Sequence, residues 1–291
     1  MNVLELKGVL KSYGDFVLDK VSFVVPEGGI CGFIGQNGAG KTTTIQLILD
    51  IVKKDAGEIK VFGTSTEDKE ALTLLKQDIG VVYDEMGFHE FMTPMDIGKM
   101  MKFIYRNWDE DVYKKYLESF GLPSGKACGK FSRGMRMKLQ IAVAMSHHAR
   151  LLIMDEPTSG LDPIVRNEIL QIFQEFVLEE NHTILLSSHI TGDLERIADE
   201  VVFINKGKIV LAGNKDEILK RHGLMKCKKE ELPKVEEEDI VSVRSGSFSV
   251  EILVKNRQEC RKKYPDLMME QPSLEDIMLF YVSGKQAEVE A

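Results

Sequence analysis

The chain has 291 residues, of which 43% are hydrophobic and 29% charged, and its formal net charge is −8. This length allows one large or two moderate domains with an ample hydrophobic core. The composition is that of an ordinary soluble protein. The acidic total disfavours non-specific binding to nucleic acid, so we expect no nucleic-acid partner. No run approaches about 18 consecutive apolar residues, so any membrane spans would have to come from another chain. Four scattered cysteines without a C-x-x-C pair indicate a reducing cytosol and neither a zinc site nor a disulfide framework.

The N-terminal part combines short strands with a glycine-rich loop. Residues 3–7 and 17–25 alternate as half-buried strands do, and residues 30–34 form the apolar run of a buried strand. The next segment, 35–42, reads GQNGAGKT and fits the phosphate-binding pattern G-x-x-x-x-G-K-[ST], before a helix expected at 43–51. The loop amides would converge on phosphate oxygens, the lysine would reach the β and γ phosphates, and the threonine hydroxyl would bind Mg²⁺. The residues expected to hold a nucleoside triphosphate are Gly35, Asn37, Gly38, Ala39, Gly40, Lys41 and Thr42.

Strands and helices then follow each other as far as about residue 222. Residues 86–148 have a helical character, whereas the flanking parts alternate between strand and helix patterns. We expect strands at 57–62, 79–83, 151–154, 183–187, 201–204 and 208–211, and helices at 67–77, 164–178 and 191–198. This order predicts an α/β fold in which helices cover both faces of the sheet. Within the helical segment, one group of methionines can serve either as core filler or as an adaptable groove for a partner helix: Met86, Met92, Met95, Met100 and Met101.

The composition changes after Arg221. Residues 223–238 are rich in charge and include Pro233, so we expect a charged linker or solvated edge there. Residues 239–282 show short strand and helix patterns and predict a small α+β appendage. Residues 283–291 are expected to be disordered.

Two carboxylates end the apolar strand at 151–154. Ligands of an open α/β sheet bind at this end of the strands. Asp155 suits a Mg²⁺ site reached through water, and Glu156 is placed to polarise the water that attacks a γ-phosphate. Ser132 is a candidate N-cap for a helix at 136–145, and His189 follows a second apolar strand. Taken alone, each of these last two residues is more simply structural.

Together these motifs resemble the ATP-binding-cassette (ABC) ATPases of transporters. The phosphate loop, FSRGM from Phe131, LLIMDE from Leu151, SGLD from Ser159 and finally His189 have that family's order and spacing over residues 1–220. The resemblance implies a P-loop NTPase core over residues 1–222, with an N-terminal antiparallel β subdomain and an inserted helical subdomain at 86–148. Later motifs at 188–194, 206–208 and 272–276 are similar to stand-alone cassettes of bacterial exporters of drugs, antibiotics and amphipathic peptides such as phenol-soluble modulins.

The resemblance also implies roles inside one subunit. Tyr13 would stack on adenine, and Thr43 would join the residues that hold phosphates and Mg²⁺. His189 would contact the γ-phosphate and position the attacking water. The implied catalytic residues are Glu156, His189 and Lys41, with ATP and Mg²⁺ as ligands.

Other roles would cross to a partner. Ser132 and Gly134 would close on the γ-phosphate of a nucleotide held by a second nucleotide-binding subunit, identical or paralogous, and Asp162 would reach towards that subunit. A separate transmembrane permease would dock near residues 84–105. The chain would then be cytoplasmic and peripheral on the inner face of the membrane.

Two departures from the family pattern stand out. The signature usually reads LSGGQ, so Arg133 and Met135 replace a glycine and a glutamine. In the lid loop after Tyr83, Asp84 replaces the usual glutamine. An ionised carboxylate can bind Mg²⁺ through water but cannot donate a hydrogen bond, so Asp84 becomes a candidate metal ligand.

Two other functions stay open at this point. One is a soluble cassette ATPase of translation or DNA repair, although such proteins usually carry two cassettes or a long coiled-coil insertion. The other is an ATP-binding regulator with little turnover, which Asp84 and Arg133 would favour. Co-purification and steady-state hydrolysis would separate these from an exporter subunit.

Overall fold

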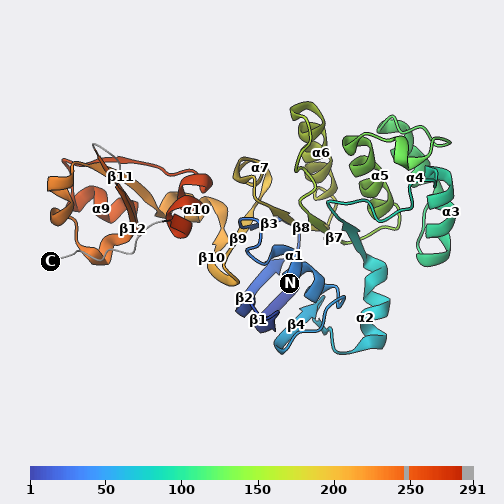
Figure 1. The fold of residues 1–291 in the computed structure, drawn as a ribbon, viewed down its shortest axis with the longest axis horizontal. Coiled ribbons are helices and arrows are strands. Elements are labelled where there is room, and N and C mark those ends of the chain that lie inside the picture. Colours follow the sequence, from blue (N-terminus) through green and yellow to red (C-terminus); the bar gives the residue numbers. More distant parts are fainter. Residues whose placement is uncertain (246–248, 284–291) are drawn as a thin grey trace.

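A central sheet of six strands organises the molecule in this computed structural model, which describes residues 1–245 and 249–283 (Figure 1). The strand order is β10-β9-β3-β8-β7-β6, and every neighbouring pair is parallel except β9 with β10. All residues of β7 and β8 are buried, as expected for parallel strands covered on both faces. The strands span Gly29–Ile34 (β3), Ile79–Val82 (β6), Leu151–Asp155 (β7), Thr183–Ser188 (β8), Glu200–Asn205 (β9) and Lys208–Asn214 (β10).

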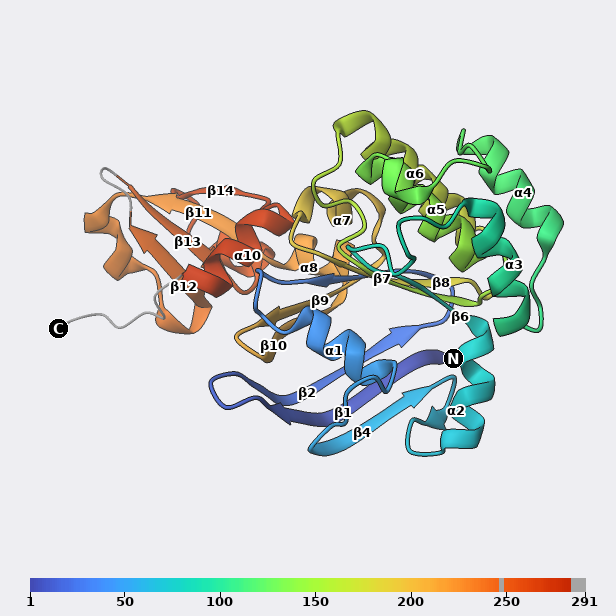
Figure 2. The same ribbon diagram turned by 45° about the vertical axis from the view of Figure 1, so that its right-hand side comes forward.

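An antiparallel sheet and one helix cover the first face of this sheet. The antiparallel sheet has the order β2-β1-β4-β5, and its strands are Asn2–Ser12 (β1), Val17–Pro26 (β2), Ala56–Val61 (β4) and Thr64–Ser65 (β5). Helix α1 (Lys41–Ile48) lies between the two sheets (Figure 2). Its Ile45 and Ile48 share a buried cluster with Leu6 of β1 and Ile153 of β7. The phosphate loop is therefore anchored at both of its ends.

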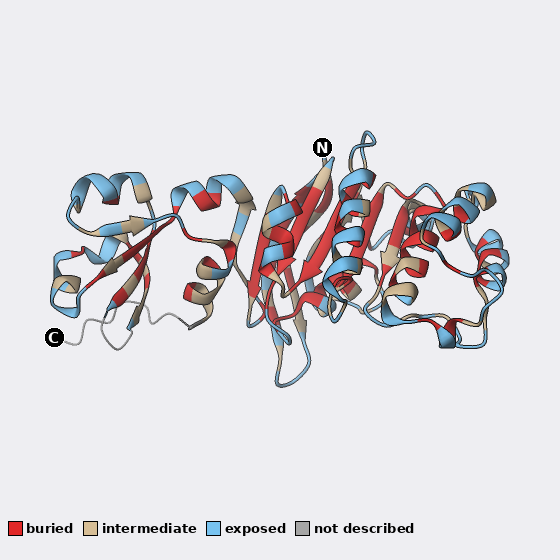
Figure 3. Cartoon of the chain, turned by 90° about the horizontal axis from the view of Figure 1, so that it is seen from above, coloured by how far each residue is buried: buried red, intermediate tan, exposed pale blue. Residues whose placement is uncertain are grey.

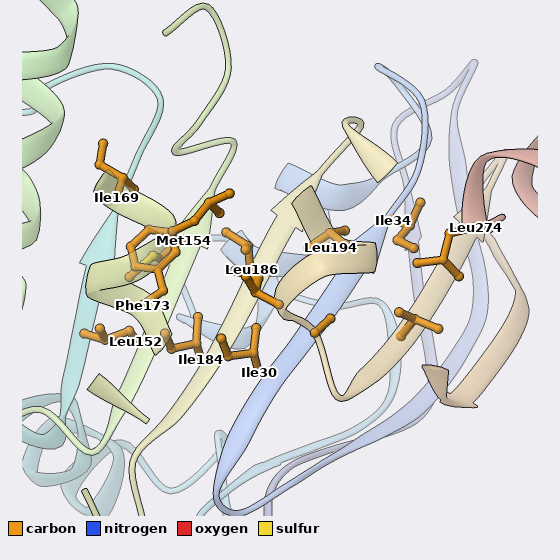
Figure 4. Close-up of a cluster of buried hydrophobic side chains, with 14 of the residues drawn as sticks. Ile30, Ile34, Leu152, Met154, Ile169, Phe173, Ile184, Leu186, Leu194 and Leu274 are labelled. Atoms are coloured by element: carbon orange, nitrogen blue, oxygen red, sulfur yellow. The ribbon is translucent and has the colours of Figure 1, made fainter. Parts of the chain in front are cut away.

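Helices α6 (Pro163–Phe176) and α7 (Thr191–Ile197) cover the second face. Phe173 of α6 and Leu194 of α7 pack on the apolar side chains of β3, β7 and β8 (Figure 4). Buried residues concentrate in the strands, whereas exposed residues line the outer sides of the helices (Figure 3). The expected α/β fold, with helices on a mostly parallel sheet, is confirmed.

The helical segment forms a lobe at one end of the sheet. Helix α2 (Lys69–Leu75) precedes β6, and the lobe itself contains α3 (Pro94–Ile104), α4 (Glu110–Ser119) and α5 (Arg133–Met145). Each of these three begins at a capping side chain: Thr93, Asp109 and Ser132. Four of the methionines belong to the lobe's core, since Met101 is buried and Met86, Met92 and Met100 pack against the cluster; Met95 is 52% exposed.

The C-terminal part forms a second antiparallel sheet, with the order β12-β13-β11-β14. Its strands are Gly223–Cys227 (β11), Ile240–Ser245 (β12), Val250–Val254 (β13) and Met268–Glu270 (β14). Helix α8 (Lys215–Arg221) leads into this sheet, and α9 (Arg257–Lys263) and α10 (Leu274–Ser283) belong to it. Leu274, Ile277 and Phe280 of α10 return to the central core, where they pack in one cluster with Leu194 of α7.

The prediction of a charged linker at 223–238 is wrong for residues 223–227. Residues Gly223–Cys227 form β11, which pairs with β13 on one side and β14 on the other. The charges that suggested a linker lie in the 3₁₀ turns Lys229–Lys234 and Glu237–Asp239, where solvent faces them, while Met225 is fully buried. The disordered tail expected at 283–291 lies outside the described residues, apart from Ser283.

Candidate functional site

The register of three neighbouring strands places the predicted motifs at one edge of the sheet. Ile34 of β3 lies beside Ser188 of β8, and Asp155 of β7 lies beside Ser187. The phosphate loop follows Ile34 directly, so the loop, the two acids and the end of β8 meet at the carboxyl ends of parallel strands. This edge is where ligands bind in open α/β sheets.

Glycines allow the loop its shape at two positions in particular. Gly40 has φ 114°, and a Cβ there would lie 2.6 Å from the side chain of Leu18. Gly35 does not have a positive φ, but a Cβ added to it would lie 2.7 Å from the carbonyl oxygen of Ile204. Only glycine avoids both the left-handed strain and the collisions. The loop therefore ends in contact with the core, and helix α1 begins directly after Gly40.

Lys41 is the buried cation of this edge. Its side chain is 5% exposed, and its ammonium donates to the carbonyl oxygen of Gly35 at 2.6 Å. The same ammonium lies 3.0 Å from Glu156 Oε1, forming an ion pair across the sheet edge. The approach is not aligned as a hydrogen bond, and Glu156 Oε1 is a buried oxygen without a hydrogen-bond donor among the described residues.

The two acids have different partners. Asp155 accepts from the hydroxyls of Thr42 at 2.7 Å and Ser187 at 2.5 Å. Glu156 Oε2 lies 2.7 Å from His189 Nδ1, and the backbone of Glu156 has the uncommon positive φ of 54°. Asp155 is thus held by hydroxyls, whereas Glu156 lies between a lysine and a histidine.

Ser187 is a site residue that the sequence reasoning missed. Its hydroxyl donates to Asp155 and lies 3.2 Å from the backbone N–H of Glu156, which donates to it. The side chain is fully buried. The signal available in the sequence was a polar residue ending an apolar strand, just before His189. Its neighbour across the sheet could not be known without the strand order.

A second group of predicted residues lies at the starts of α5 and α6. Ser132 caps α5 by accepting from the N–H of Met135 at 3.2 Å, and Asp162 caps α6 by accepting from the N–H groups of Ile164 and Val165 at 3.1 Å. A Cβ on Gly134 would lie 2.9 Å from the side chain of Val165, so the glycine lets the two helix starts approach. No recorded hydrogen bond or ion pair within the described part of the chain joins this group to the phosphate loop.

Tyr13 stands apart from both groups. The residue is 48% exposed, and the ammonium of Lys11 lies 5.4 Å from the centroid of its ring. Lys11 is itself fixed by Asp55 at 2.8 Å. An exposed aromatic face of this kind can accept a stacked base.

The residues at the sheet edge fit a magnesium ion, whereas Asp84 is engaged elsewhere. Thr42 Oγ1 and Asp155 Oδ2 are hard oxygen donors 2.7 Å apart, and Mg²⁺ is typically held by one or two carboxylates together with phosphates and water. No group of three or more His, Cys, Asp or Glu side chains that could hold a metal ion occurs in residues 1–245 and 249–283. Asp84 instead forms an ion pair with Arg133. No helix in the described ranges is long and apolar enough to cross a bilayer.

Comparison with known proteins agrees with this geometry. The sequence model of the ABC transporter family matches residues 18–159. The chain is 36% identical over 225 residues to the bacitracin transport ATP-binding protein BcrA of Bacillus licheniformis, covering 76% of this chain and 72% of that protein. It is 32% identical over 212 residues to the lantibiotic transport ATP-binding protein SrtF of Streptococcus pyogenes, covering 72% of this chain and 90% of that protein.

The solved structure of an ATP-binding subunit of an ABC transporter superposes with a TM-score of 0.67 at 28% identity, covering 74% of this chain and 91% of that one. Family, fold and site geometry therefore lead to one assignment. The chain belongs to the ATP-binding subunits of ABC transporters, the ATPases that drive transport.

Proposed function

We propose that this chain is the ATP-hydrolysing subunit of a bacterial exporter of antibiotics or amphipathic peptides. The contact set of Lys41, Glu156 and His189 at the sheet edge carries the proposal of hydrolysis. The cargo class rests on the relatives, which are named for the transport of bacitracin and a lantibiotic.

Binding of the triphosphate would rearrange the charges around Lys41. The phosphates would lie against the loop amides at the start of α1, and their charge would attract the ammonium away from Glu156. Glu156 would then be free to accept a proton from the attacking water. His189, 2.7 Å from Glu156 Oε2, would keep the carboxylate in place and lie beside the terminal phosphate.

Thr42 and Asp155 are the residues that would hold Mg²⁺. Ser187 would orient Asp155, since its hydroxyl already donates to the second carboxylate oxygen. When bound, the ion would neutralise part of the negative charge on the phosphates. Tyr13 would supply the stacking face for adenine.

The site would be completed by a second subunit. Ser132 and Gly134 lie at the start of α5, where the N–H groups of the first turn and the helix dipole favour an anion. They would act on the nucleotide held by the opposing chain, with Asp162 near the same boundary. Two subunits would then enclose two ATP molecules and separate after hydrolysis.

An apolar surface on the helical lobe would receive the permease. Four side chains between residues 84 and 105 are exposed by half or more: Phe91, Met95, Phe103 and Ile104. Contiguous exposed apolar residues typically mark an interaction site, and we propose these four residues as contacts of the permease. Docking there would place the chain on the cytoplasmic face of the membrane.

The proposal is tested by replacing Glu156 in the purified full chain. Glu156→Gln keeps the shape but removes the proton acceptor, so the rate of ATP hydrolysis should fall at least about 100-fold. Glu118→Gln, an exposed glutamate on α4, is the matched control and should hydrolyse ATP like wild type. Wild-type turnover by Glu156→Gln would contradict the assignment, and co-purification with ribosomes or DNA instead of a membrane protein would contradict the exporter.

A further inference from the structure

Arg133 links the start of α5 to two loops of the subunit. Its guanidinium pairs with the carboxylate of Asp84 in the loop after β6, and both side chains are nearly half exposed, at 45% and 46%. The same guanidinium lies against Gly160 in the loop before α6, where a Cβ would be only 3.1 Å from its central carbon. Arg133 itself is the first residue of α5. Arg133, one of the two departures in the signature, is therefore the partner of Asp84, the departure in the lid loop.

A second contact, on the same side of α5, also joins this helix to the loop after β6. Gln140 lies seven residues after Arg133, which places both side chains on one face of the helix. The Gln140 amide donates to the carbonyl oxygen of Tyr83 at 3.1 Å and accepts from its N–H at 3.4 Å. Gln140 is 6% exposed, so this contact is buried. Helix α5 thus holds Tyr83 by a buried amide and Asp84 by an exposed ion pair, and the exposed one is the easier to break.

The chemistry of Arg133 suits a stronger partner than one carboxylate. A guanidinium presents its donors as a planar fork that matches phosphate oxygens, and a triphosphate carries several negative charges. Arg133 stands between Ser132 and Gly134, the residues proposed to face the nucleotide of the opposing subunit. This step rests on that proposed function. A cation at the start of α5 that can turn from Asp84 towards phosphate would change partners when two subunits close.

We propose that Asp84 holds Arg133 in the resting subunit, and that on closure Arg133 exchanges this carboxylate for the phosphates of the nucleotide bound by the opposing subunit. Asp84 is then a positioning residue that acts through Arg133 and not a magnesium ligand. The nucleotide must displace Asp84 before it gains Arg133, so the pair raises the ATP concentration at which the subunits close.

The expected effects differ in sign for the two partners. An exposed ion pair contributes up to about 1 kcal/mol, which corresponds to about a fivefold change in an equilibrium constant. Asp84→Asn should therefore lower the ATP concentration for half-maximal closure by about twofold to fivefold. Arg133→Gln loses the pair and the phosphate contact together, so this concentration should rise at least about tenfold above that of Asp84→Asn, because hydrogen bonds between charged groups are the stronger ones.

ATP-dependent dimerisation of the full chain is measured by sedimentation velocity at a saturating concentration of Mg²⁺. Glu156→Gln serves as the parent so that ATP is not consumed. The matched control is Glu270→Gln, which breaks the similarly exposed Lys226–Glu270 pair (38% and 43%) in the C-terminal sheet and should leave the ATP dependence unchanged. Thermal unfolding of each variant checks that it is folded. If the parent binds ATP but never dimerises, the proposed shared site fails; if it dimerises and Asp84→Asn shifts nothing, this inference fails.

Two further arms test how Asp84 acts. In the Arg133→Gln background, Asp84→Asn should have no additional effect, because its partner is already gone; an independent shift would overturn the proposal. Titration of Mg²⁺ at saturating ATP should give the same half-saturation for Asp84→Asn and the parent. A Mg²⁺ requirement raised severalfold by Asp84→Asn would identify Asp84 as a metal ligand and refute the exchange. Equal ATP half-saturation in Asp84→Asn and Arg133→Gln would also refute it.

Discussion

Ser187→Ala is the most direct test of how β8 supports the two acids. The substitution removes one hydroxyl that donates to Asp155 at 2.5 Å and accepts from the N–H of Glu156 at 3.2 Å. The cavity left by one oxygen atom is small, so the effect comes from the lost hydrogen bonds. Ser188→Ala is the matched control. Ser188 is equally buried on the same strand, but its hydroxyl accepts from the N–H of Ile190 at 2.9 Å and does not contact either acid.

The contacts set the expected magnitudes. A hydrogen bond to a charged group contributes about 1.5–3 kcal/mol, against about 0.5–1.5 kcal/mol for a neutral one. We therefore expect the free energy of unfolding to fall by about 2 kcal/mol in Ser187→Ala and by about 1 kcal/mol in Ser188→Ala. Because Ser187 also contacts both acids of the proposed site, kcat should fall about tenfold in Ser187→Ala, which corresponds to about 1.4 kcal/mol in the activation barrier.

The assay is steady-state ATP hydrolysis by the full chain together with urea unfolding, performed on both variants. Ser188→Ala should retain kcat within about twofold of wild type, since its lost bond lies outside the acids. Equal losses of kcat in the two variants would show that general loosening of β8, and not the contact with Asp155, controls the rate. Wild-type kcat in Ser187→Ala would refute the positioning role.

Three other predictions concern stability and nucleotide affinity. Gly80→Ala would place a Cβ 2.5 Å from a leucine side chain and 2.6 Å from a backbone carbonyl, so the free energy of unfolding measured in urea should fall by about 1–3 kcal/mol. Gly192→Ala is the control and should cause no loss, because its Cβ would meet nothing within 4 Å. Burial lowers the pKa of His147 and His222 below the ordinary 6.5, so at low pH the unfolded chain binds protons that the folded chain does not. The contribution of these histidines to the free energy of unfolding should therefore be fully present above pH 6.5 and should be lost as the pH falls below it. A urea midpoint that stays constant between pH 7.5 and 5.5 would contradict this. Tyr13→Ala should weaken ATP binding by about fivefold or more in calorimetry, from the loss of about 1 kcal/mol of stacking, with no change in the urea midpoint.

The local chemistry of the site was readable from the sequence. The phosphate loop, the acids after an apolar strand and the cap at Ser132 depend on residues close together in the chain, and the structure has these local features where they were expected. Glycine torsions, capping side chains and turn chemistry act over a few residues. The family resemblance followed from these local signals, and the relatives confirm it.

Only the tertiary structure decided which residues meet. Buried parallel strands such as β7 and the middle of β8 are apolar on both faces, so their sequences carry little information on neighbour or register. The contact of Ser187 with Asp155 and the pairing of Arg133 with Asp84 join residues 32 and 49 positions apart, which no local pattern could reveal. Strand β11 was also not predictable, because charged turns follow it in the sequence and its pairing with β13 and β14 is what makes it a strand. The sequence determined the chemical groups, and the pairing of distant strands and loops determined how they act together.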